Sequence, residues 1–453
     1  MNFNSVNPFT QEKIAGFELE DSKNIEKKLQ IAEKAFLSWK KTPLNLKLDL
    51  VLNLANKLEE NKTILAQTIT IEMGKTFKES LAEIEKSYVS IRYFAANAQI
   101  NLIPQQVLNS AKESFFIYEP TGCILAIMPW NFPFWQALRI AIPNLITGNV
   151  VMLKHAPNVQ MCANFLEKMF LEVGFHQGIF QNICVDIPQI EQIISSKIIS
   201  GVTLTGSSIA GSSVASLAGK HLKKSVLELG GSDPFIVLDD ADLQKAAKMA
   251  VKSRFQNAGQ TCIAAKRWIV TEKIYENFVE EVIKSTKNII CGDPFHENTI
   301  IGPMARIDLA EKLNLQKKNL IKNGGIELLQ SNQINCLVSP GILEISRELA
   351  YSFSEEIFGP IACIIKAKNE NEAVEIANET TFGLGASVWT ADIEKAKVLG
   401  YGIDSGSIFI NSMVKSDASL PFGGTKASGY GRELGAIGFH EFANIKSFWV
   451  EEV

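Results

Sequence analysis

The feature that most constrains the fold is an alternation of short β-rich runs and helical stretches that starts at Gly122. The apolar runs are CILAIMP, GNVVMLK, GVTLTG, SVLELGG, PFIVLDD and RWIVTEKI, and stretches such as CANFLEKMFLEVG and LQKAAKMAVKSRFQ separate them. Strands that are apolar on both faces and separated by helices are typical of largely parallel sheets covered by helices. We therefore predict an α/β fold, and the 453 residues predict two or three lobes.

The rest of the chain predicts helices first and two isolated strand segments. Apolar residues recur at helical spacing over 22–40 and 44–73, and the amphipathic pattern continues past Gly74 to about Ala98. Segments 102–119 and 444–453 have the composition of strands but belong to neither main sheet. We interpret these two segments as an oligomerisation flap.

Composition and charge exclude several functional classes. The net charge of −4 offers no basic surface for nucleic acid or an anionic membrane. The longest apolar region, 124–153, is interrupted by polar residues and prolines, so we expect it to be core and not a membrane span. The interrupting residues are Pro129, Asn131, Pro133, Arg139, Pro143 and Asn144. The seven cysteines have no CxxC spacing and the five histidines are dispersed, which argues against disulfides and a metal site. No targeting segment is visible, so a reducing cytoplasm is expected.

Four short motifs have chemical potential, but each alone is ambiguous. TGSSIAG at 205–211 follows a strand-like run and predicts a turn and helix start whose N–H groups face an anion. PWNFP at 129–133 is either a Pro-rich turn or a stiff support for one amide. Glu228 in LELGG is a solvated strand end or a base, and Cys262 in GQTC is a small buried residue or a nucleophile. GKT at 74–76 is not a phosphate loop, because Ile69 replaces the upstream glycine.

The order of the motifs PWNFP, TGS, ELGG, GQTC, EEIFGP and PFGG resembles the aldehyde dehydrogenase superfamily over essentially the whole chain. ILAIMPWNFPFW and VLELGGSDPFIVLDDADL are most similar to the short bacterial NAD(P)-dependent succinate-semialdehyde dehydrogenases. The resemblance implies two Rossmann-like parallel-sheet lobes and a small β flap. It implies a cofactor-binding domain at 1–101 and 120–228, a catalytic domain at 229–419, bridging segments at 102–119 and 420–453, and a homodimer or homotetramer.

The resemblance also implies roles for three catalytic residues. Cys262 would add to the aldehyde carbon as a thiolate and form a thiohemiacetal, which loses hydride to the nicotinamide and becomes a thioester. Asn131 and the backbone N–H of Cys262 would form the oxyanion hole. Glu228 would activate the water that hydrolyses the thioester to a carboxylate.

The implied cofactor is NAD or NADP, without a metal. Glu356 would hold the nicotinamide ribose, with Phe358 beside it, and Gly206 and Ser207 would hold the pyrophosphate. Trp130 and Lys154 would flank the adenosine half. Many NAD-specific relatives have KPSE where this chain has KHAP at 154–157, so the carboxylate that would repel a 2′-phosphate is missing. We therefore expect dual use of NAD and NADP.

For the substrate, the resemblance points to succinate semialdehyde. Arg139 would bind the distal carboxylate, while Trp135 and Ser419 would line the substrate mouth. Alternatively, Arg139 ties down a neighbouring acid, and the enzyme then prefers other semialdehydes or aliphatic and aromatic aldehydes. An acyl transferase to coenzyme A is disfavoured because such relatives usually lack the ELGG glutamate. A catalytically silent protein is disfavoured because Cys262, Asn131, Glu228 and Glu356 occur together.

Overall fold

The computed structural model describes residues 2–452 and contains two main sheets. The first has the strand order β21-β9-β8-β5-β6-β7, and all its strands are parallel except β21, which pairs antiparallel with β9. Its strands are β5 (Cys123–Met128), β6 (Val150–His155), β7 (Phe180–Asn182), β8 (Ile199–Thr205), β9 (Lys224–Glu228) and β21 (Gly429–Tyr430). The predicted parallel arrangement is confirmed.

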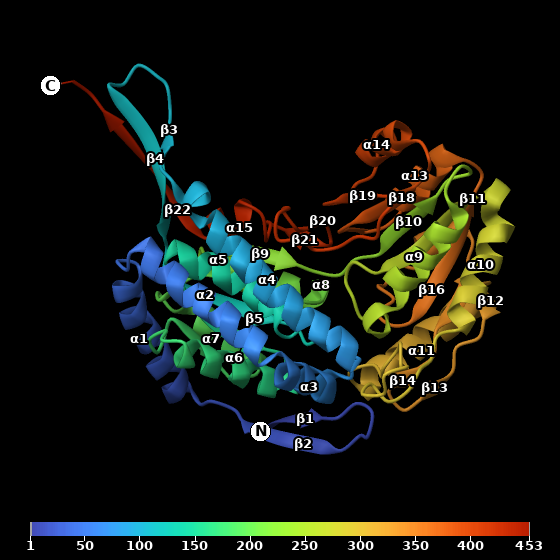
Figure 1. The fold of residues 1–453 in the computed structure, drawn as a ribbon, viewed down its shortest axis with the longest axis horizontal. Coiled ribbons are helices and arrows are strands. Elements are labelled where there is room, and N and C mark those ends of the chain that lie inside the picture. Colours follow the sequence, from blue (N-terminus) through green and yellow to red (C-terminus); the bar gives the residue numbers. More distant parts are fainter. Residues whose placement is uncertain (1, 453) are drawn as a thin grey trace.

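Helices surround the first sheet, as the apolar spacing predicts. The N-terminal helices are α1 (Ser22–Trp39), α2 (Leu44–Glu60), α3 (Lys62–Met73) and α4 (Phe77–Leu102). The crossover helices are α5 (Trp135–Thr147), α6 (Gln160–Glu172), α7 (Ile190–Ser195) and α8 (Ser208–Lys220). Figure 1 shows this lobe in blue and green, with α4 running diagonally across it. One continuous apolar core joins these helices to the sheet.

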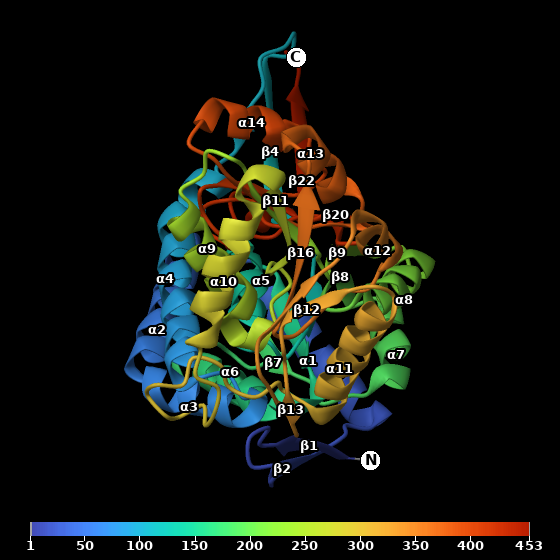
Figure 2. The same ribbon diagram turned by 90° about the vertical axis from the view of Figure 1, so that its right-hand side faces the viewer.

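The second sheet has the strand order β12-β15-β16-β11-β10-β18-β19 and is parallel except for its edge strand β12. Its strands are β10 (Asp233–Val237), β11 (Ala265–Thr271), β12 (Ile326–Leu329), β15 (Gly341–Glu344), β16 (Ile361–Ala367), β18 (Ala386–Trp389) and β19 (Ile408–Ile410). Its helices are α9 (Leu243–Phe255), α10 (Tyr275–Lys287), α11 (Ile307–Lys322), α12 (Arg347–Ser352), α13 (Glu370–Asn378) and α14 (Ile393–Tyr401). Figure 2 shows α9 and α10 on one side of β16, with α11 and α12 on the other. Separate apolar clusters fill the two faces, so both are covered.

The two isolated strand segments pair with each other. β4 (Glu113–Pro120) lies between β3 (Gln105–Gln106) and β22 (Ala443–Val450) in a three-stranded antiparallel sheet. This flap projects from the first lobe and carries the C-terminal end of the chain (Figure 1). Residue 453 of the predicted tail lies outside the described residues.

Two features differ from the sequence-based organisation. A hairpin of β1 (Asn2–Val6) and β2 (Lys13–Glu18) precedes the helices. The sequence pattern predicts no helix or strand before residue 22. Segment 420–453 is not flap alone, because its β21 extends the first sheet beside β9. The change between sheets falls between Glu228 and Asp233, near the predicted domain boundary; the domain bounds themselves stay predictions.

Candidate active site

The turn before Cys262 is held in an unusual backbone conformation. Cys262 follows the short helix η3 (Gln256–Gly259), in which Asn257, Ala258 and Gly259 have φ of 52°, 51° and 70°. The left-handed region costs a residue with a side chain roughly 1–2 kcal/mol. Hydrogen bonds hold the turn: the Asn257 N–H donates to Glu79 Oε1 at 2.7 Å, and its amide donates to the Asn131 carbonyl at 3.0 Å. Such enforced backbone strain is common at active sites.

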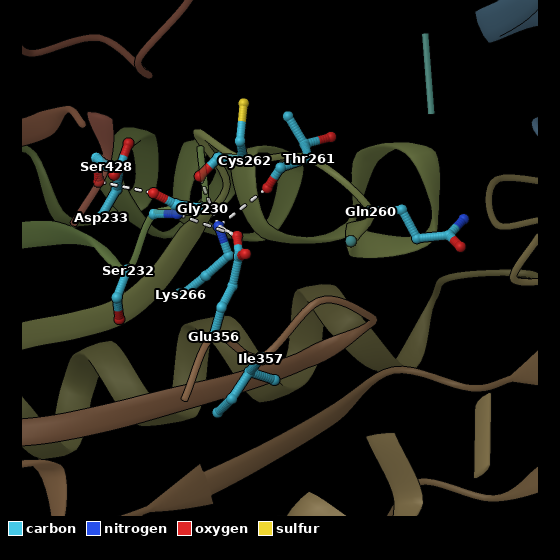
Figure 3. A network of polar contacts seen from close by, with 12 residues as sticks. Gly230, Ser232, Asp233, Gln260, Thr261, Cys262, Lys266, Glu356, Ile357 and Ser428 are labelled. Atoms are coloured by element: carbon cyan, nitrogen blue, oxygen red, sulfur yellow. Dashed lines mark hydrogen bonds and ion pairs between the residues drawn. The ribbon is translucent and has the colours of Figure 1, made fainter. Parts of the chain in front are cut away.

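A buried lysine supports the nucleophile segment from behind. The Nζ of Lys266 donates to the carbonyls of Thr261 at 3.0 Å and Cys262 at 2.6 Å, and pairs with Glu356 Oε1 at 3.0 Å. Figure 3 shows the Cys262 thiol pointing away from this network. Burial raises the pKa of the thiol to about 11, although the charges of Lys266 and Arg139 lower it. The resting group is therefore a thiol at neutral pH.

The predicted oxyanion group lies against the nucleophile turn. Asn131 is buried and its side-chain amide donates to the Gln260 carbonyl at 2.9 Å. An amide has two N–H groups, so the second N–H is left for a substrate oxygen. Asn131 and Cys262 both line the same cavity. The structure thus brings these two sequence-predicted residues together.

Groups that sequence reasoning missed hold the PWNFP segment. The carboxylate of Glu83 accepts from the backbone N–H groups of Phe134 at 2.9 Å and Trp135 at 3.1 Å, at the start of α5. Lys75 pairs with Glu83 and lies 3.7 Å from the centroid of the Phe132 ring. The discarded GKT sequence therefore supplies a buried cation beside the oxyanion segment.

His155 fastens the same segment from the end of β6. Its Nε2 lies 2.9 Å from the Pro133 carbonyl, and its Nδ1 accepts from the Ala156 N–H at 2.9 Å. Burial lowers the pKa of the ring to about 4. The neutral tautomer with hydrogen on Nε2 satisfies both contacts.

The predicted base, Glu228, is buried at the end of β9. Neither of its carboxylate oxygens has a hydrogen-bond partner among residues 2–452. Burial raises its pKa well above the usual range, and the charge of Glu433 raises it further. Glu228 is therefore protonated in this arrangement, and it needs a proton acceptor or a change of surroundings before it acts as a base.

A cavity of about 410 Å³ extends from the start of α8 to Cys262. Its wall includes most of the predicted cofactor residues: Trp130, Gly206, Ser207, Glu356 and Phe358. The rings of Trp130 and Phe358 meet edge to face at 5.8 Å. The carboxylate of Glu356 lies against Gly230: a Cβ added to Gly230 would be 2.5 Å from Oε2 of Glu356. These contacts define one wall of the predicted nicotinamide region.

The same cavity fits a dinucleotide chemically. Ser207 caps α8, and the first N–H groups of a helix have no acceptor within the helix. Ser208 and Ile209 of this first turn line the cavity, so their N–H groups and the helix dipole favour a phosphate group there. Lys154 is not among the lining residues and lies 5.9 Å from the Phe3 ring of the hairpin. Its contact with the adenosine half stays a prediction.

The three predicted substrate residues differ in what they contact. Arg139 is buried, pairs with Glu433 and donates to Thr205 Oγ1 at 3.3 Å. This arrangement corresponds to the alternative interpretation, in which Arg139 pairs with a neighbouring acid. The pair lies in the interior of the protein. Ser419 is exposed and its hydroxyl donates to Asp417 at 2.7 Å. Trp135 is buried, and its indole N–H donates to Ser416 Oγ at 3.2 Å.

No helix within residues 2–452 combines the length and the apolar composition needed to cross a membrane. No three His, Cys, Asp or Glu side chains within the same range are grouped so that they could hold a metal ion.

Comparison with known proteins places the chain among enzymes. It belongs to the aldehyde dehydrogenase family, whose model matches residues 1–448. It is 40% identical over 451 residues to a probable NADP+ succinate-semialdehyde dehydrogenase of Synechocystis, covering 98% of this chain and 99% of the relative. It is 39% identical over 453 residues to an NAD(P)+ succinate semialdehyde dehydrogenase of Escherichia coli, covering 99% and 98%.

Solved structures agree with this assignment. The fold matches the crystal structure of a succinic semialdehyde dehydrogenase from Streptococcus pyogenes in complex with NADP+, with a TM-score of 0.97 and 34% identity. The match covers 99% of this chain and all of that one. The predicted fold class and an NAD(P)-dependent oxidoreductase activity are thereby confirmed.

Proposed function

We propose that this chain oxidises succinate semialdehyde to succinate with NADP or NAD, using Cys262 as the nucleophile. The observation that carries the proposal is the cavity that joins the start of α8 to Cys262 and Asn131. The relatives that act on succinate semialdehyde, at 39–40% identity over the full chain, support this substrate.

In the proposed reaction, the Cys262 thiol releases its proton to solvent and its sulfur adds to the aldehyde carbon, whose C=O bond opens to a negative oxygen. The second N–H of the Asn131 amide stabilises the negative oxygen of the adduct; removing one such donor typically costs ~10²–10³ in rate. NAD or NADP held by the first turn of α8 and by Glu356 and Phe358 would supply the hydride acceptor. Glu228 first gives its own proton up to solvent and, as a carboxylate, takes a proton from the water that attacks the thioester carbon. The carbon–sulfur bond then breaks, the product leaves as the carboxylate, and the Cys262 sulfur takes a proton from Glu228 to restore the thiol.

Lys266 and Glu356 connect the nucleophile segment to the nucleotide cavity. Lys266 holds the Cys262 carbonyl and pairs with Glu356, which faces the nucleotide cavity. The thiol and the ribose-binding carboxylate therefore share one support. Such fixed positioning of reacting groups is a large part of catalysis. We further expect a homodimer or homotetramer in a reducing cytoplasm.

The test is steady-state turnover of succinate semialdehyde and of butanal, each with NAD and with NADP. We expect the kcat/KM for succinate semialdehyde to be at least about tenfold higher than the kcat/KM for butanal. Cys262→Ala should abolish turnover of both aldehydes, while Glu228→Gln should accumulate the thioester, visible as a burst of reduced nucleotide followed by slow turnover. A native enzyme that prefers butanal would refute the substrate but not the family.

A further inference from the structure

Lys86 of α4 lies where three segments of the chain meet. Its Nζ donates to Ser416 Oγ at 2.7 Å and lies 4.3 Å from the centroid of the Trp135 ring. The Trp135 indole N–H donates to the same hydroxyl oxygen. Helix α4, the start of α5 and the segment after β19 therefore converge on Ser416.

The charge of Lys86 has no counter-ion in this arrangement. No carboxylate of residues 2–452 lies within 4.0 Å of its Nζ, whereas the nearby cations Lys75 and Arg139 pair with Glu83 and Glu433. Lys86 is half-buried. A cation that is partly removed from water without a partner is unfavourable, and a bound anion would offset that cost.

Several surrounding charges act on Lys86 in opposite directions. Burial and the charge of Arg139 lower its pKa to about 8, while Glu83, Asp417 and Cys262 raise it. The ammonium form is still substantially populated at neutral pH.

Lys86 also contacts the segment that follows the oxyanion residue. Trp135, which its ammonium contacts, follows the oxyanion residue Asn131 by four positions, and the charge of Cys262 acts on Lys86. In a four-carbon semialdehyde the distal carboxylate is only three C–C bonds from the aldehyde carbon. Its binding group must therefore lie near enough to Cys262 for their charges to interact, and the charge of Cys262 is among those that act on Lys86.

We propose that Lys86 and the hydroxyl of Ser416 bind the distal carboxylate of the substrate, an inference that rests on the proposed oxidation of a semialdehyde. Lys86 supplies the charge. Ser416 accepts two hydrogen bonds, and its own hydroxyl hydrogen has no acceptor among residues 2–452, so it is free to donate to the carboxylate. Arg139 instead stays on Glu433 and fixes the acid beside Glu228.

The experiment measures the ratio of kcat/KM for succinate semialdehyde to kcat/KM for butanal. We expect Lys86→Met to lower this ratio by about 10- to 100-fold, the range for one hydrogen bond to a charged group, mainly through the KM for the semialdehyde. Lys86→Arg should restore part of it. The matched control is Lys78→Met, because Lys78 is exposed on the same helix; its ratio should equal that of the native enzyme.

Ser416→Ala is the second variant, and it keeps the test decisive if Lys86→Met does not fold. It should lower the same ratio by about 10-fold or more through loss of one hydrogen bond to the charged carboxylate. An unchanged ratio in folded Lys86→Met or, failing that, in Ser416→Ala overturns the inference while the proposed function stands. A native enzyme without preference for the semialdehyde instead refutes the proposed function.

Discussion

The buried pair of Lys75 and Glu83 allows a quantitative prediction. Glu83 accepts the backbone N–H groups of Phe134 and Trp135 and pairs with Lys75, and the two paired side chains are 1% and 0% exposed. Glu83→Gln keeps an acceptor oxygen for the backbone but removes the countercharge. Lys75 is then a buried cation with no carboxylate partner, and breaking a buried pair in this way typically costs about 3–5 kcal/mol.

The expected shift in Tm follows from the size of the chain. Unfolding entropy is about 2.1 cal/mol/K per residue, so 453 residues give about 1 kcal/mol/K. Glu83→Gln should therefore lower the Tm by about 3–5 °C. Because the same carboxylate anchors the segment after Asn131, kcat should fall as well.

The assay is differential scanning calorimetry on a cycle of Glu83→Gln, Lys75→Met and the double variant. The double variant should be more stable than Glu83→Gln alone, because it no longer contains the uncompensated ammonium. Glu85→Gln, on the exposed side of α4, is the control and should change the Tm by less than about 1 °C. Strictly additive effects of the two substitutions would refute the reasoning.

Three further predictions concern the thiol, a histidine and the flap. Without nucleotide, alkylation of Cys262 by iodoacetamide should keep accelerating from pH 8 to pH 10, because only the thiolate reacts and its pKa is raised to about 11; a plateau by pH 8.5 in peptide mass spectrometry would contradict this. The pKa of His155 is about 4 in the folded protein and about 6.5 in the unfolded chain. The unfolded state therefore binds an additional proton between these values. The free energy of unfolding should fall as pH drops from 6.5 to 4, by up to about 3 kcal/mol. His155→Gln should lose less Tm than the native chain between pH 7.5 and pH 5, and equal losses would exclude the assignment. Because Phe448 and Trp449 are exposed on β22, gel filtration should show at least twice the chain mass, and Trp449→Glu should shift the protein toward monomer.

The sequence predicted the strands of the main sheets, but it did not predict the hairpin β1–β2 or the short strand β21. Strands β5, β6 and β8 are buried over nearly their whole length, so their continuous apolar runs identify buried parallel strands without tertiary information. The hairpin β1–β2 was missed because its residues are mostly exposed or half-buried and alternate weakly. β21 was missed because two residues have no detectable pattern.

The candidate site also contains residues that the sequence located and contacts that it did not predict. The motifs located Cys262, Asn131 and the cavity wall, because their order along the chain is specific. The contacts of Arg139 were not predictable, because its partner Glu433 comes from a distant segment and only the folded chain brings them together. A cation near the oxyanion motif in sequence is therefore not necessarily the cation that is free to bind an anion.

One signal in the sequence was available and overlooked. Glu79, Glu83 and Lys86 recur at spacings of four and three, which puts them on one face of α4. That face also carries the buried Phe94, and the buried Ile84 and Ile91 lie on the side next to it. Charged side chains among apolar ones on a packed face contradict the usual amphipathic pattern, and such a local conflict often marks a functional region.

The charged face of α4 reaches three segments that are far apart in the chain. Glu79 holds the turn before Cys262 and Glu83 holds the start of α5, while Lys86 holds the segment after β19 through Ser416. A site supported by one rigid helix is positioned more accurately than one built on loops alone. Because the same helix orients the nucleophile turn, the oxyanion segment and the proposed carboxylate site, a substrate held at Lys86 would be held in register with the thiol that attacks it.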